Sequence, residues 1–226
     1  MTTRTLAAAV LAAGCFAATA AQAEGIEPYI GIGGSYMALS GDSGGFNTLG
    51  AFSNVDSDDT TALAFRAVAG IGNLVSLGER LSLRGELEFV MPQTAKYETF
   101  SLAPPYYAND DMIGGFVNLW LDIEVPELRE GTALFIGGGY GGFRHDFSVT
   151  DGVVTGTKST DAYAYNLGGG IKTPIVQNLE AVLMTRYVDY GKIGANLDGG
   201  ASGDYNIDQT GVEFGFTIQI MLGGLL

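Results

Sequence analysis

The chain has 226 residues, with 25 Asp and Glu against 11 Lys and Arg, which gives a net charge of −14 at pH 7. Binding to a nucleic-acid backbone needs clusters of Lys and Arg that this sequence lacks, so we expect no nucleic-acid partner. Glycine supplies 35 residues, only 16% of residues are charged, and no long stretch repeats its apolar residues with a helical period. This composition favours a single all-β domain.

The N-terminus has the pattern of a secretory signal peptide. Arg4 precedes an Ala-rich apolar run, and a small-x-small cleavage site ends at Ala23. We expect residues 1–23 to be removed as a signal peptide and residues 24–226 to form the exported domain. The only cysteine, Cys15, lies in the removed segment, so the mature chain can form no disulfide. A lipobox ending at this cysteine is the alternative interpretation.

Seven stretches of the mature chain alternate apolar and polar residues with a period of two, which indicates β-strands. In chain order they cover residues 28–38, 61–72, 81–91, 111–123, 133–144, 161–172 and 179–190. The connections alternate in length, and the long ones cover residues 39–60, 93–110, 146–160 and 191–208. Long loops on one side and short turns on the other are typical of outer-membrane barrels.

The last strand, residues 211–222, alternates most strictly, with an apolar side chain at every second position from Val212 to Leu222. Its length suits a tilted strand that crosses the hydrocarbon core of a bilayer. A sheet in lipid can leave no edge unpaired, so we expect this strand to pair with the first one. The sequence therefore predicts an all-β fold, an eight-stranded antiparallel up-and-down transmembrane β-barrel with short periplasmic turns and long extracellular loops.

Short glycine-rich blocks along the chain carry a family resemblance. Residues 28–33 read PYIGIG, residues 117–119 read VNL and are followed after a turn by LFIGGG at 134–139, and residues 185–187 read TRY. In this order and spacing they resemble the small OmpA-like and Opa-like outer-membrane β-barrels over the whole mature chain.

The resemblance implies a surface antigen of the Gram-negative outer membrane that is inserted by the barrel-insertion machinery through its C-terminal strand. Such barrels usually end in phenylalanine, whereas this chain ends in Leu226. We expect the aliphatic terminus to weaken recognition by that machinery without altering the fold.

Alternation alone fits a membrane barrel with an apolar outside and also a lipocalin-like soluble barrel with an apolar inside. The aromatic residues of the apolar face all lie toward the long-loop ends of their strands, which is where interfacial rings prefer to sit. We therefore expect the apolar face to meet lipid. The predicted outer aromatic girdle consists of Tyr36, Phe65, Phe89, Tyr140, Tyr163, Tyr165, Tyr187 and Phe214. Ordinary core aromatics are the alternative.

The polar face then lines the barrel interior. The predicted interior network consists of Arg66, Arg84, Glu86, Glu88, Asn118, Asp122, Glu180, Arg186 and Glu213. Because an unpaired charge is costly there, we expect arginines and carboxylates to pair and seal the lumen, with Arg84 meeting Glu86 or Glu88. A titratable gate or narrow channel is the alternative.

Residues that could carry chemistry are few. The single histidine, His145, is followed three residues later by Ser148, which has the opposite strand parity. This parity disfavours a shared site, and we expect a solvated rim histidine. The alternative is hydrolysis like that of an outer-membrane lipid A deacylase, which uses a His and a Ser. Asp56, Asp58 and Asp59 could hold calcium, but the glycine and distal glutamate of an EF-hand loop are missing. We expect no enzymatic activity, no cofactor and no metal.

These features together predict a monomeric outer-membrane barrel with a structural or surface-interaction role, a plugged polar interior and acidic extracellular loops. The expected partners are outer-membrane lipid and lipopolysaccharide, the insertion machinery, and a loop ligand that the sequence does not identify. A narrow small-solute channel and an outer-membrane lipid hydrolase are the alternative functions.

Overall fold

A computed structural model describes residues 26–47, 50–56, 59–92, 94–99, 106–150, 152, 155–197 and 203–223. Within these residues the chain forms ten strands and no helix that is long and apolar enough to cross a membrane. The strands are β1 (Glu27–Asn47), β2 (Gly50–Asp56), β3 (Thr60–Ser76), β4 (Leu81–Pro92), β5 (Ala95–Thr99), β6 (Tyr106–Glu124), β7 (Ala133–Thr150), β8 (Thr155–Val176), β9 (Leu179–Leu197) and β10 (Gly203–Met221).

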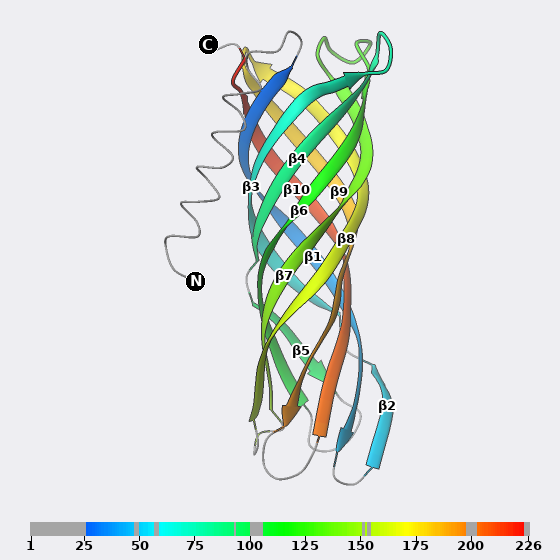
Figure 1. Ribbon diagram of the computed structural model, residues 1–226, viewed down its shortest axis with the longest axis vertical. Helices are drawn as coiled ribbons and strands as arrows, with labels where there is room; N and C mark the ends of the chain where they lie inside the picture. Colours follow the sequence, from blue (N-terminus) through cyan, green and yellow to red (C-terminus); the bar gives the residue numbers. More distant parts are fainter. Residues whose placement is uncertain are drawn as a thin grey trace.

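Eight of these strands form a closed antiparallel ring (Figure 1). Their order around the ring is β1, β3, β4, β6, β7, β8, β9 and β10, and β10 pairs with β1 to close it. Each strand of the ring pairs with its neighbours in the chain, as an up-and-down topology requires. The predicted fold class is therefore confirmed.

Seven of the eight ring strands, all except β4, run well beyond a predicted end, and two short strands lie where the sequence predicts long loops. β1 continues to Asn47 and β7 continues to Thr150. β2 pairs with β1, and β5 pairs with β6, beyond the long-loop end of the β3–β4 ladder. The last pair of that ladder joins Ala64 to Pro92. The barrel wall is therefore longer than the predicted strands, and in Figure 1 β2 and β5 lie at the end opposite to the short turns.

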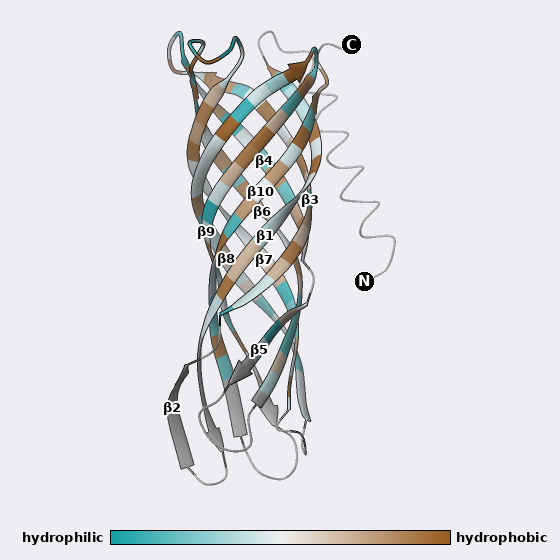
Figure 2. Ribbon diagram, turned by 180° about the vertical axis from the view of Figure 1, so that it is seen from behind, coloured by the Kyte–Doolittle hydropathy of each residue, from teal (hydrophilic) through white to brown (hydrophobic). Residues whose placement is uncertain are grey.

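Along the segment near the short turns, apolar residues face outward and polar residues face inward. Ile32 of β1 and Val117 of β6 are 73% and 63% exposed, whereas Arg84 of β4 is buried. Figure 2 shows the resulting alternation of hydrophobic and hydrophilic residues along these strands. A lipocalin-like soluble barrel would bury the apolar face, so this alternative from the sequence is wrong.

Toward the long-loop end of the barrel wall, the outward face becomes polar. On β7 the outward positions read Leu134, Ile136 and Tyr140, and then Arg144 and Asp146, all of them exposed. The same change falls between Ile113 and Asp111 on β6, between Tyr163 and Asp161 on β8, and between Tyr187 and Asp189 on β9.

The inward face changes in the opposite sense at about the same level. Between the buried charges and the long-loop end, the inward side chains form one apolar cluster that includes Met37, Leu39, Phe116, Phe143, Phe147, Val188, Tyr190, Ile193 and Ile207. We call the part of the barrel between this change and the long-loop end the extension. It has polar side chains outside and an apolar core inside, which is the pattern of a β-structure that stands in water.

The apolar outward band has the height of a bilayer core. On β6 it runs from Ile113 to Ile123, and with a rise of about 3.3 Å per residue and the usual barrel tilt this corresponds to about 25 Å. Outer-membrane barrels carry an apolar band of about this height.

Leu119, which is 50% exposed near the middle of this band, tests the lipid face. Leu119→Arg should lower the free energy of unfolding in lipid vesicles by about 2 to 4 kcal/mol, because the guanidinium would meet the bilayer midplane. Asn109→Arg, on the same strand and the same outward face but in the extension, should change it by less than about 0.5 kcal/mol. Urea unfolding measures both, and equal effects would contradict the assignment of the lipid face.

Candidate functional site

The barrel interior is the candidate site, and its glycines make room for it. On β7 a glycine stands beside three of the large inward residues of β6. The register pairs Phe116 with Gly141, Asn118 with Gly139 and Trp120 with Gly137. A Cβ atom on Gly139 would collide with the amide oxygen of Asn118, and one on Gly168 would collide with Arg186. The glycine blocks of β7 and β8 are therefore sites of close approach that let long side chains from β6 and β9 fill the lumen.

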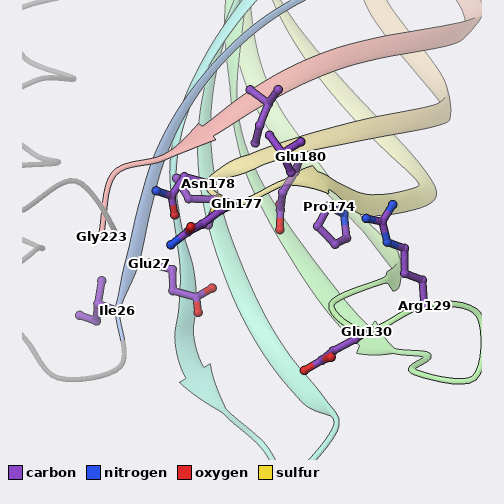
Figure 3. Close-up of a pocket in the computed structure, with 12 residues that line it drawn as sticks. Ile26, Glu27, Arg129, Glu130, Pro174, Gln177, Asn178, Glu180 and Gly223 are labelled. Atoms are coloured by element: carbon purple, nitrogen blue, oxygen red, sulfur yellow. The ribbon is translucent and has the colours of Figure 1, made fainter.

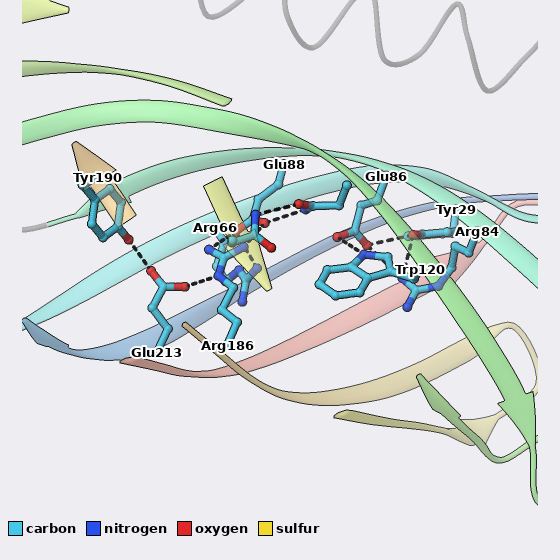
Figure 4. A network of polar contacts seen from close by, with 11 residues as sticks. Tyr29, Arg66, Arg84, Glu86, Glu88, Trp120, Arg186, Tyr190 and Glu213 are labelled. Carbon is cyan, nitrogen blue, oxygen red and sulfur yellow. Dashed lines mark hydrogen bonds and ion pairs between the residues drawn. The ribbon is translucent and has the colours of Figure 1, made fainter. Parts of the chain in front are cut away.

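The central cluster lies halfway along the interior and joins Arg66, Glu88, Arg186 and Glu213 (Figure 4). The Arg186 guanidinium donates to both carboxylate oxygens of Glu88, at 2.6 and 2.9 Å, and to Glu213 at 2.5 Å. Arg66 donates to Glu88 at 2.5 Å, and the Tyr190 hydroxyl donates to Glu213 at 2.6 Å. All of these side chains are buried, so two cations and two carboxylates neutralise each other out of contact with water.

The short-turn cluster lies closer to the short turns and is built around Arg84 (Figure 4). Its Nε atom lies 3.1 and 3.2 Å from the two carboxylate oxygens of Asp122, and its Nη1 atom donates to Glu86 at 3.1 Å. The Tyr29 hydroxyl accepts from Arg84 at 3.0 Å and donates to Glu86 at 2.8 Å. Lys172 completes the cluster with a 2.8 Å contact to Asp122. This cluster also holds two cations and two carboxylates.

The expected partners of Arg84 are partly corrected. Arg84 does pair with Glu86, but Glu88 belongs to the central cluster, where two guanidinium groups bind it. Glu88 stands four residues along the same strand from Arg84, so the separation of the two clusters follows from strand geometry.

Residues that were not part of the predicted network complete it. Tyr29, Trp120 and Tyr190 are buried, and each bonds a carboxylate through its ring hydroxyl or indole N–H. Lys172 and Asn166 also take part. Their inward parity was a signal in the sequence, but reach across the lumen depends on the register between strands, which parity does not specify.

Among the predicted interior residues, Glu180 differs from the rest. The other eight are buried, whereas Glu180 is half-buried at the short-turn end. Among the described residues no cation contacts its carboxylate, because the nearby Lys172 is bound to Asp122.

The apolar core of the extension encloses two polar pairs. His145 lies 2.9 Å from Asp110 through its Nδ1 atom, and the Gln209 amide donates to the Tyr97 hydroxyl at 2.6 Å. His145 is fully buried, so the expectation of a solvated rim histidine is wrong. β7 continues past it as regular strand, which turns its side chain into the core and that of Ser148 to the opposite face. A shared His–Ser site does not form.

A void between the two clusters is small. It amounts to about 10 Å³ and is lined by Arg66, Arg84, Thr217 and Gln219 among others. That is about the space of one water molecule. A larger cavity of about 850 Å³ opens at the short-turn end, between the short-turn cluster and the turns (Figure 3).

The residues of the predicted girdle lie on the outward face. Seven of the eight are exposed, Phe89 is half-buried, and the rings of Tyr140 and Tyr163 stack with centroids 5.7 Å apart. They lie on the short-turn side of the change to polar outward residues. This level is where a bilayer interface would meet the barrel.

The described residues contain no group of three His, Cys, Asp or Glu side chains arranged for a metal ion. Of the candidate calcium segment, Ser57 and Asp58 lie outside the described residues, and so does Cys15.

A closed antiparallel ring with an apolar outer band and buried ion pairs inside defines a transmembrane β-barrel of the outer-membrane type. No family model and no curated protein matches the sequence. Solved structures match the fold: the outer-membrane protein OprG from Pseudomonas aeruginosa has 12% identity and a TM-score of 0.52, with 84% of this chain and 95% of OprG covered.

Two further solved structures are similar. The outer-membrane protein AlkL has 18% identity and a TM-score of 0.49 over 86% of this chain and 89% of its own. Neisserial surface protein A has 13% identity and a TM-score of 0.46 over 87% and 99%. At 12% identity, the likeness to OprG shows the fold alone.

A double-mutant cycle tests the partition into two clusters. Arg84→Ala should cost about 3 to 5 kcal/mol in urea unfolding, because it leaves Asp122 and Glu86 buried with too few cations. Adding Asp122→Asn should recover part of this loss, whereas the effect of Glu88→Gln should add to it within about 0.5 kcal/mol. Coupling of Arg84 to Glu88 but not to Asp122 would contradict the two clusters.

Proposed function

We propose that this protein is a non-catalytic barrel of the bacterial outer membrane that displays its extension at the cell surface. The observation that carries the proposal is the reversal of side-chain polarity along the wall. An apolar core inside and charged residues such as Arg144 and Asp146 outside suit a segment that stands in water above a bilayer. Its role is structural or one of surface interaction, through acidic loops that the extension carries.

Its position in the membrane rests on the apolar band and the girdle. The tyrosines of β7, β8 and β9 supply hydroxyl groups at the level where headgroups begin, which favours outer-membrane lipid and lipopolysaccharide as the surrounding partners. In this proposal residues 1–23 direct export and are removed after Ala23. The barrel-insertion machinery then takes up the chain through its C-terminal strand, as the resemblance to OmpA-like and Opa-like barrels suggests.

A closed lumen distinguishes this proposal from the channel alternative. Three levels of side chains occupy the interior, namely the short-turn cluster, the central cluster and the apolar core of the extension. Each ion-pair cluster is neutral and offers no free charge to a passing ion. In this proposal the protein acts as a monomer, which a ring that closes within one chain permits.

Surface labelling tests the orientation. With Cys15 removed in the signal peptide, single cysteines can be introduced by Lys158→Cys in the extension and Glu127→Cys in a short turn, both at exposed positions. A membrane-impermeant maleimide should label the first in intact cells and the second only after the outer membrane is broken. Equal labelling, or labelling of the second alone, would contradict the orientation.

Conductance in planar bilayers tests the closed lumen. The purified barrel should show no steady single-channel steps, because the void between the two clusters holds about one water molecule. Arg186→Ala together with Glu88→Ala and Glu213→Ala removes most of the central cluster and serves as the variant with a widened interior. Regular steps in the unmodified protein that change in this variant would favour the narrow channel.

A further inference from the structure

The void between the two ion-pair clusters is lined by hydrogen-bond donors that lack an acceptor. Arg66 of the central cluster and Arg84 of the short-turn cluster both line it, and the two clusters can be followed in Figure 4. Among the described residues no acceptor bonds the Nε atom of Arg66 or the Nη2 atom of Arg84, although these residues are only 5% and 2% exposed. A buried N–H group without a partner is unfavourable, so a hydrogen-bond acceptor in this void would be stabilising.

The same void also offers an acceptor. Glu86 lines it, and the two oxygens of its carboxylate are used unequally. One oxygen accepts from Tyr29 at 2.8 Å and from Arg84 at 3.1 Å, whereas the other has only a 3.4 Å contact with the indole N–H of Trp120. A carboxylate oxygen can accept a further hydrogen bond. A molecule in the void can therefore accept from the guanidinium groups and donate to Glu86.

These requirements distinguish water from an anion. A water molecule accepts with two lone pairs, donates with two hydrogens and carries no charge. A halide ion cannot donate to Glu86, and it would add a negative charge to an interior in which each cluster is already neutral. A volume of about 10 Å³ holds about one water molecule and nothing larger.

We propose that this void is a binding site for a single water molecule, which accepts from Arg66 and Arg84 and donates to Glu86. The water links the two clusters without adding charge, so the buried polar groups act as one connected network. The clusters lie on either side of it, and the water exchanges with solvent only when one of them opens. This slow exchange rests on the closed lumen proposed above, whereas the site itself rests only on the buried side chains.

The test observes the Nε–H proton of Arg66 by NMR, in the full barrel with isotope-labelled arginine in detergent micelles. A water at this site should give a rotating-frame cross-peak between the water signal and this proton, with the sign of a dipolar contact and not that of chemical exchange. Arg144, which is exposed on the outer face, is the internal control and should give no cross-peak of that sign.

Two matched variants test the position of the water. Val182 lines the void, so Val182→Ile places one more methylene group there and should abolish the cross-peak. Val188 is buried on the same face of β9 but is not among the residues that line the void. Val188→Ile adds the same group and should leave the cross-peak in place.

Three results would overturn the proposal. The first is the lack of a dipolar cross-peak in the unmodified protein, which needs no variant to fold. The second is a cross-peak that persists in Val182→Ile. The third is a shift of the Arg66 Nε–H signal when sulfate replaces chloride in the buffer, which would identify a halide as the occupant. Regular single-channel steps together with an intact cross-peak would contradict the closed lumen while supporting the water site.

Discussion

The structure depends on one constraint, which is that a backbone in lipid must find all of its hydrogen bonds within the sheet. The pairing of β10 with β1 satisfies it by removing the two edges that the ring would otherwise expose. Closure in turn divides every strand into a face toward lipid and a face toward a narrow lumen. The apolar band, the inward charges and the glycines that make room for them all follow from this division.

Charges inside so narrow a lumen are tolerated because they are arranged in two neutral groups. Each cluster sets two cations against two carboxylates, and buried hydroxyl or amide groups satisfy further oxygens. Breaking one contact would leave a buried charge without its partner, which is strongly destabilising. The ion pairs join β3, β4, β6, β8, β9 and β10 across the lumen, and so they oppose slippage of one strand against another.

Strand periodicity alone predicts the ring, the two faces and most of the buried charges, because a period of two is visible wherever one face is apolar and the other is not. It fails where that contrast reverses. Around His145 the apolar residues move to the inward positions, so Phe143 and Phe147 continue a strand that the pattern predicts to end at Arg144. The pattern does not predict β2 and β5, since they are short, and the partner of Arg84 depends on strand register and side-chain length. Neither of these can be read from a single strand.

The extension also constrains how the barrel is made. In the orientation proposed above, its outward side chains, among them Arg144, Asp161 and Asp189, have to cross the hydrocarbon layer during insertion. An arginine at the bilayer midplane costs about 2 to 4 kcal/mol, and several charges cross on adjacent strands. This creates a kinetic barrier to spontaneous insertion that grows with the length of the extension. After insertion the same barrier opposes withdrawal. The polar outward residues of the extension therefore hold the barrel at a defined depth in the bilayer.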